Sequence, residues 1–147
     1  MIKIFDLRLK QVDDILISGT SRGNLLLSLP GGGTFEGERI KGKVLPLGLC
    51  NTYTPESGMN FIYSPQVLVT DDGATIFMEL NAYLHLPQEL EDRISAGESV
   101  DPGMYYYKGT VRFDVGDPKY KWLENKLFIC DGTIDNWKQL QFEVYEI

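Results

Sequence analysis

The strand expected between Met104 and Phe113 carries the side chains best suited to chemistry. Because side chains alternate between the two faces of a strand, Tyr106, Lys108 and Arg112 share one face. Two cations and a phenol together can bind a carboxylate, an enolate or a phenolate. If this face lines a cavity, all three residues are ligand-binding candidates.

The same alternation permits a second interpretation of this strand. Its other face is aromatic and apolar and could belong to a core: Tyr105, Tyr107, Val111 and Phe113. The cationic face would then lie outside, in water. Burial statistics favour this second interpretation, because lysine and arginine are rarely fully buried.

Two carboxylates are candidates for a general base. Glu79 lies within the strand expected over 75–86, and Glu36 lies in a glycine-rich segment. A carboxylate in an apolar-walled cavity has a raised pKa and can accept a proton, while Lys108 or Arg112 stabilises an oxyanion. The alternatives are a solvated strand face for Glu79 and backbone N–H partners in the glycine-rich bend for Glu36.

Aromatic side chains elsewhere could form the walls of a pocket. Trp122 lies in a short segment beyond the cationic strand. It could stack on a flat ligand or, more simply, close one end of a barrel, because an indole buries a large area. Tyr53 follows a long strand, beside Cys50 and Asn51, and could rim the opposite mouth.

Several common kinds of site have no match in this sequence. The single histidine, His85, excludes a His-rich metal site, and Cys50 and Cys130 lack the CxxC spacing of structural zinc. The glycines at 31–33 lack the ending of a phosphate loop and the GxGxxG spacing. We therefore expect neither a metal nor a cofactor.

Composition limits the compartment and the partners. The 147 residues predict one domain, over 1–147, and carry 21 acids against 14 bases, a net charge of −7. An acidic surface disfavours binding to nucleic acid or to anionic membranes. The N-terminus is not an apolar signal segment, so we expect a cytoplasmic protein whose two cysteines are buried free thiols.

Strand signals dominate the pattern along the chain. Alternating or short apolar segments, separated by turn residues, predict about nine strands: 2–9, 15–18, 24–29, 35–49, 60–70, 75–86, 104–113, 126–133 and 138–147. Asp71 and Asp72, followed by Gly73, are typical of a hairpin turn. One short helix is expected over 87–96, with Gly97 closing it. This pattern fits an all-β barrel or sandwich.

Several blocks, in order, resemble a known family. They are GGTFEG (32–37) with GKVLPLG (42–48), TDDGATI (70–76), YYKGTVRFD (106–114) with YKWL (120–123), and FEVYEI (142–147). The chain resembles the domain-of-unknown-function family 3237, also called uncharacterised protein family 0311. The resemblance implies a calycin-like (lipocalin-like) antiparallel β-barrel of about 8–10 strands, often a small oligomer, with no established cofactor.

Two sites depart from the pattern of that family. Cys50 and Asn51 stand where the family usually has an acid followed by tryptophan, and Lys108 stands where it usually has arginine. If the acid and the arginine face one another across a pocket, both ends of the pair have changed here. Lysine cannot replace arginine in a planar bidentate contact.

Three functions remain after these observations. We favour a small-molecule-binding barrel whose ligand is a small aromatic, carboxylate or enolisable compound, because barrels of this size have room for one ligand. The alternative is a cofactor-free isomerase, cyclase or lyase that uses a pocket carboxylate and a Lys or Arg. The third is a homodimeric interaction module without a ligand.

Overall fold

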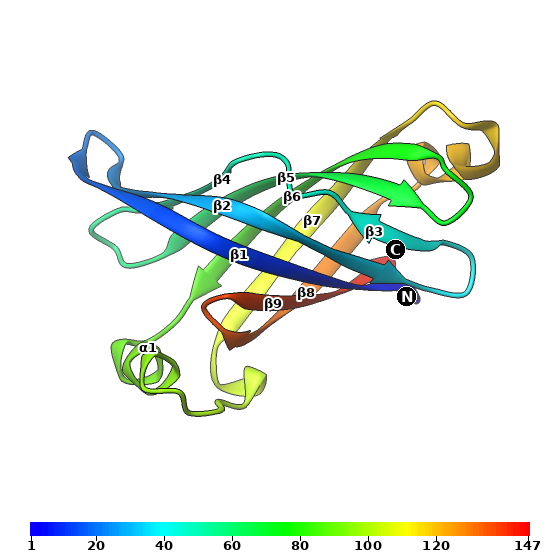
Figure 1. The fold of residues 1–147 in the computed structure, drawn as a ribbon. Coiled ribbons are helices and arrows are strands. Elements are labelled where there is room, and N and C mark those ends of the chain that lie inside the picture. Colours follow the sequence, from blue (N-terminus) through cyan, green and yellow to red (C-terminus); the bar gives the residue numbers. More distant parts are fainter.

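A computed structural model describes residues 1–147 (Figure 1). Nine strands, one α-helix and two short 3₁₀ segments follow one another as β1 (Ile2–Thr20), β2 (Gly23–Glu36), β3 (Lys41–Val44), β4 (Cys50–Thr54), β5 (Asn60–Thr70), β6 (Thr75–His85), α1 (Gln88–Ser95), η1 (Pro102–Met104), β7 (Tyr106–Val115), η2 (Pro118–Asn125), β8 (Phe128–Asn136) and β9 (Gln139–Glu146). No helix is both long and apolar enough to cross a lipid bilayer.

All strand pairs are antiparallel, and the sheet closes on itself. β1 pairs with β9 on one side and with β2 on the other. β3 and β4 occupy a single position, because both lie between β2 and β5 and pair with different stretches of each. The result is an antiparallel barrel with eight strand positions, which confirms the predicted fold class.

The strands at the start of the chain differ from the prediction. The segment Pro30–Gly33, whose composition is typical of a turn or a bulge, lies inside β2, and the expected strand over 35–49 breaks after Glu36. The β1–β2 pair shifts register between Leu9 and Gln11, and again before Asp13, opposite the glycines at 31–33. The strand bends there and continues. A bulge lets a long hairpin curve around a barrel without ending.

The interior of the barrel is filled by alternate residues of each strand. On β6 the inward set is entirely buried: Ile76, Met78, Leu80, Ala82 and Leu84. These side chains belong to one core cluster of 30 residues. The period of two in the sequence therefore assigns the faces of β6 correctly.

One end of the barrel is closed by aromatic side chains. Phe5 is 1% exposed and packs edge-to-face on Phe35 and Phe113, with ring centroids 5.6 and 6.0 Å away. From η2, Leu123 is buried and Trp122 packs against the same core cluster. Trp122 thus closes this end, as the simpler interpretation of the sequence predicted.

The other end of the barrel carries α1 (Figure 1). Leu90 and Ile94 of this helix are buried in the core cluster, and the indole N–H of Trp137 donates to the Ser95 hydroxyl at 2.9 Å. The helix ends at Ser95, and Gly97 follows the C-cap Ala96 with a φ of 86°, which suits glycine. These contacts fix α1 beside the mouth of the barrel.

Asp72 connects the β5–β6 hairpin to η2. Its carboxylate accepts hydrogen bonds from the hydroxyls of Thr70 (2.5 Å) and Tyr120 (2.8 Å), and pairs with the Lys119 ammonium at 2.7 Å. These contacts hold the pKa of Asp72 well below its ordinary value. The contact with Lys119 contributes most, followed by those with Thr70 and Tyr120.

Replacing Asp72 with asparagine is expected to lower the midpoint of thermal unfolding at neutral pH. A carboxyl whose pKa is lower in the folded state stabilises the fold above its unfolded pKa, and this stabilisation is lost as the pH falls through the folded pKa. The midpoints of wild type and D72N should therefore begin to approach each other as the pH falls below the unfolded value of 3.8, and should converge only below the lower folded pKa. A difference that is the same at neutral and strongly acidic pH would contradict this explanation.

Candidate functional site

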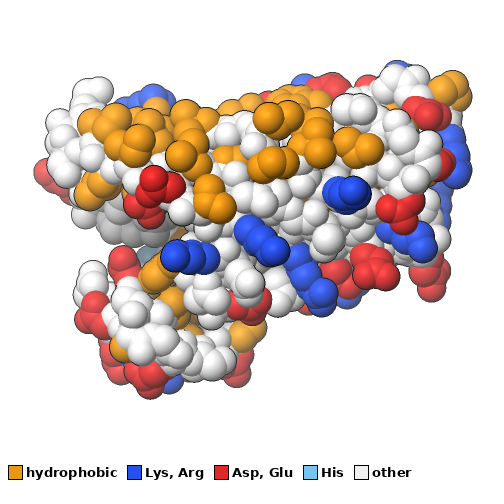
Figure 2. Space-filling model, viewed as in Figure 1, with side chains coloured by type: hydrophobic (Ala, Val, Ile, Leu, Met, Phe, Trp, Pro, Cys, Tyr) orange, Lys and Arg blue, Asp and Glu red, His pale blue; other side chains and the backbone are white.

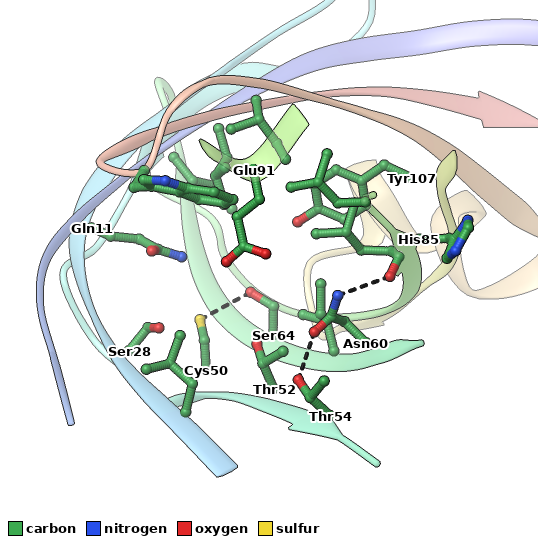
Figure 3. Close-up of a pocket in the computed structure, with 18 of the residues that line it drawn as sticks. Gln11, Ser28, Cys50, Thr52, Thr54, Asn60, Ser64, His85, Glu91 and Tyr107 are labelled. Atoms are coloured by element: carbon green, nitrogen blue, oxygen red, sulfur yellow. Dashed lines mark hydrogen bonds between the residues drawn. The ribbon is translucent and has the colours of Figure 1, made fainter. Parts of the chain in front are cut away.

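A cavity of about 670 Å³ opens at the end of the barrel that carries α1 (Figure 3). Every strand except β3 contributes to its lining, together with α1 and the β8–β9 turn. A volume of this size matches the pockets that hold small organic ligands. The closed aromatic end lies on the opposite side of the barrel and makes the cavity blind.

The floor of the cavity is a small polar cluster made by Cys50, Ser64 and Gln66. The Gln66 amide donates to the Ser64 hydroxyl at 2.8 Å and reaches the Cys50 sulfur at 3.5 Å, while the Ser64 oxygen lies 3.1 Å from that sulfur. Gln66 is only 1% exposed, and its Oε1 has no hydrogen-bond partner in the protein. A buried acceptor without a partner costs free energy, so this floor is unusual for a barrel interior.

The Cys50 thiol is a neutral group on this floor. Burial raises its pKa above the ordinary cysteine value, and the contacts with Ser64 and Gln66 oppose that shift only partly. The second cysteine, Cys130, is also free and buried, and burial raises its pKa to about 12. Since the thiolate is the reactive form of cysteine, this shift disfavours the reactive form of Cys50.

Two further hydroxyls reach the cavity without a partner in the protein. Ser28 is 3% exposed and lies opposite Cys50 in the β2–β4 pair. Tyr107 is also buried, and burial raises the pKa of its phenol well above the ordinary tyrosine value. Neither hydroxyl donates or accepts a hydrogen bond within the chain, and both residues line the cavity. Such groups need water or a ligand as partner.

The mouth of the cavity has one carboxylate, that of Glu91 on α1. Its side chain points into the cavity from above the floor (Figure 3). The nearby Asn60 amide already has hydrogen-bond partners. It accepts from the Thr54 hydroxyl at 2.6 Å and donates to the Leu84 carbonyl at 3.0 Å. Glu91 is therefore the charged group that a bound molecule meets at this mouth.

The cationic face of β7 lies outside the barrel. Tyr106 is exposed, Lys108 pairs with Asp131, and Arg112 is 75% exposed and lies 3.4 Å from Glu79. An interior location for this face is wrong, and the outer location favoured by burial statistics is confirmed. The physical reason is alternation, because Tyr107 occupies the inward position between Tyr106 and Lys108.

Neither carboxylate proposed as a base reaches the cavity. Glu79 lies on the outer face of β6, where it accepts a hydrogen bond from the Tyr63 hydroxyl at 2.6 Å. Glu36 is exposed at the closed end, beside a shallow polar recess of about 300 Å³. No group of three or more His, Cys, Asp or Glu side chains is placed to hold a metal.

The two aromatic wall candidates also lie elsewhere. Tyr53 is on β4 but faces outward, with the Arg22 guanidinium 3.9 Å from its ring centroid. The ring of Trp122 is covered by the Arg39 guanidinium at 3.8 Å, at the closed end. Of the residues expected at a mouth, only Cys50 lines the cavity, and it lies on the floor.

The two positions that depart from the family pattern do not face one another. Cys50 points into the cavity, whereas Lys108 is on the outer surface with Asp131. The hypothesis of an acid–arginine pair across a pocket is therefore wrong for these positions. Only the change at position 50 alters the cavity.

Sequence reasoning missed Ser64, Gln66 and Glu91. One signal was available, because Ser64 and Gln66 interrupt the set that includes Ile62 and Leu68 on one face of β5. The opposite face, with Phe61, is more apolar in sequence, although Phe61 is 40% exposed. Polar residues on one face of a strand can thus mean that the face lines a cavity, and not only that it faces solvent.

Comparison with known proteins places the chain in a family. A family model described as "Protein of unknown function (DUF3237)" matches residues 1–147. A UPF0311 protein of Clostridium acetobutylicum is 35% identical over 98 residues, 67% of this chain; the match spans only 62% of that relative's length.

Two solved structures share the whole barrel. A conserved protein of unknown function from Rhodopseudomonas palustris has a TM-score of 0.91 and 26% identity, covering 99% of this chain and 95% of the other. A β-barrel-like protein from Acinetobacter baumannii has a TM-score of 0.85 and 28% identity, covering 99% and 93%. With the match over all 147 residues, the chain belongs to the DUF3237 family of proteins of unknown function.

Proposed function

We propose that this protein binds a small, largely apolar organic molecule in the cavity of the barrel. One observation carries the proposal: the hydroxyls of Ser28 and Tyr107 line a largely apolar cavity, and neither has a hydrogen-bond partner within the chain. Apolar walls with a few converging polar groups are the usual chemistry of ligand sites.

The position of the charges narrows the ligand class. Lys108 and Arg112, the groups that would recognise a carboxylate, are on the outer surface. We therefore favour a small aromatic or enolisable compound without a carboxylate. The residues suggested for a cofactor-free isomerase, cyclase or lyase also lie outside the cavity, so binding is the better proposal.

Thermal stability in the presence of compounds tests this proposal. A ligand at 100 times its Kd adds about 2.7 kcal/mol, which corresponds to a rise of roughly 5–10 °C in the unfolding midpoint for a chain of this size. The screen should compare phenols, enolisable ketones and aromatic acids of two or three rings. No shift with any class would contradict the proposal.

A second proposal concerns self-association, because the barrel has an apolar outer surface. An outer apolar patch crosses β1, β2, β4, β5 and β6, and consists of Ile15, Ile17, Leu25, Leu27, Leu29, Tyr53, Phe61 and Tyr83 (Figure 2). A contiguous exposed apolar patch of this kind marks an interaction site.

The charges at the ends of this patch suit a second copy of the chain. Arg22 lies at one end, against Tyr53, and Asp13, which pairs with Leu29, lies at the other end of the patch. Neither residue forms an ion pair within the chain. A twofold axis through the patch would bring Arg22 beside Asp13 of the second copy, and the central contact would be uncharged on a chain of net charge −7.

Replacing Ile17 with aspartate is therefore expected to convert a homodimer into a monomer. Sedimentation equilibrium at micromolar concentration measures the mass directly. Leu127→Asp, at an exposed leucine far from the outer apolar patch, is the matched control and should remain dimeric. A monomeric wild type, or a dimer that I17D does not disrupt, would contradict the proposed interface.

A further inference from the structure

We propose that Glu91 determines which ligands the cavity accepts: apolar ring compounds whose polar end is a hydroxyl or an ammonium group, in preference to carboxylates. This inference rests on the proposed binding function. It adds the chemical class of the polar end and the residue that selects it.

The first support is the fixed position of Glu91. Leu90 and Ile94, on either side of it along α1, are buried in the core. The indole N–H of Trp137 donates a hydrogen bond to the Ser95 hydroxyl at 2.9 Å. A helix anchored at three places holds its backbone firmly. The backbone at Glu91 is therefore held at the mouth, and Figure 3 shows the carboxylate directed into the cavity above Ser64.

The second support is that no cation within the cavity neutralises this carboxylate. Glu91 forms no ion pair and no hydrogen bond within the chain, whereas its neighbour Asp92 accepts from the Gln88 amide at 2.9 Å. Lys10 borders the mouth, but it follows the inward-facing Leu9, and alternation directs its side chain outward. Glu91 thus places an unpaired negative charge at the mouth.

The third support is the hydrogen-bonding character of the mouth. The Glu91 carboxylate there can only accept, whereas the hydroxyls of Ser28 and Tyr107 deeper in the cavity can both donate and accept. The mouth is therefore where a donor on the ligand is preferred. A hydrogen bond to a carboxylate is stronger than one between neutral groups, while a ligand carboxylate would be repelled.

A matched series of naphthalene derivatives tests the inference. Isothermal titration calorimetry at neutral pH should compare 2-naphthol, 2-(aminomethyl)naphthalene and 2-naphthoate, which share one ring system and differ in the polar end. Wild type is expected to bind the alcohol and the amine at least about tenfold more tightly than the carboxylate, a difference of about 1.4 kcal/mol. In Glu91→Gln this preference should fall to about threefold or less, chiefly because naphthoate binds more tightly.

The control for this experiment lies on the same helix. Glu89 is exposed and does not line the cavity, so Glu89→Gln makes the same change in net charge without altering the site. E89Q should keep the wild-type preference. If E91Q keeps it too, or if wild type binds all three compounds equally, the role of Glu91 is wrong while the binding function stands. If wild type binds none of them, the proposed function fails and this inference fails with it.

Discussion

Replacing Thr52 with tryptophan is expected to abolish ligand binding without unfolding the protein. Thr52 lies on β4 with its side chain in the cavity, between Leu26 and Ile62 of the neighbouring strands. A cavity of about 670 Å³ has room for an indole, so the new ring occupies the ligand's place rather than displacing the core. The affinity for any compound found by thermal stability should fall at least about tenfold, or about 1.4 kcal/mol.

A threonine on the opposite face of the sheet provides the matched control. Thr110 is exposed on the outer face of β7 and does not border the cavity. Thr110→Trp should bind ligand like wild type. Equal loss of binding in T52W and T110W would show that a tryptophan acts indirectly, and unchanged binding in T52W would place the ligand outside this cavity.

Replacing Phe5 with alanine is expected to cost about 3–5 kcal/mol of unfolding free energy. The side chain is 1% exposed at the closed end and makes edge-to-face contacts with Phe35 and Phe113. Deletion of the ring removes buried area and both contacts, and leaves a void that the closed sheet cannot collapse to fill. Urea denaturation measures the loss, with the slope of the transition checked for constancy.

Phe77 offers the comparison of the same residue type in a different environment. It lies on the outer face of β6 and is 37% exposed. Phe77→Ala should cost clearly less than Phe5→Ala, because part of the ring already contacts water. Similar losses at the two positions would contradict the assignment of the core to the inner face.

Where neighbours along the chain decide a feature, the sequence predicted it. Alternation separated the two faces of β6 and of β7, since a side chain's face depends only on its position in its own strand. Asp72 and Gly73 predicted the β5–β6 hairpin, and Gly97 the end of α1. In each case the deciding contacts span a few residues.

Features that depend on distant strands could not be predicted from the sequence in the same way. The more apolar face of β5, which includes Phe61, is the outer one, because closure of the barrel directs Ser64 and Gln66 inward. In the sequence, nothing distinguishes Glu91 from other acids on a surface helix. Only the tertiary contact between Trp137 and Ser95 places α1, and with it Glu91, at the mouth. Alternation along one strand identifies two faces, but only pairing around the whole barrel determines which face surrounds the cavity.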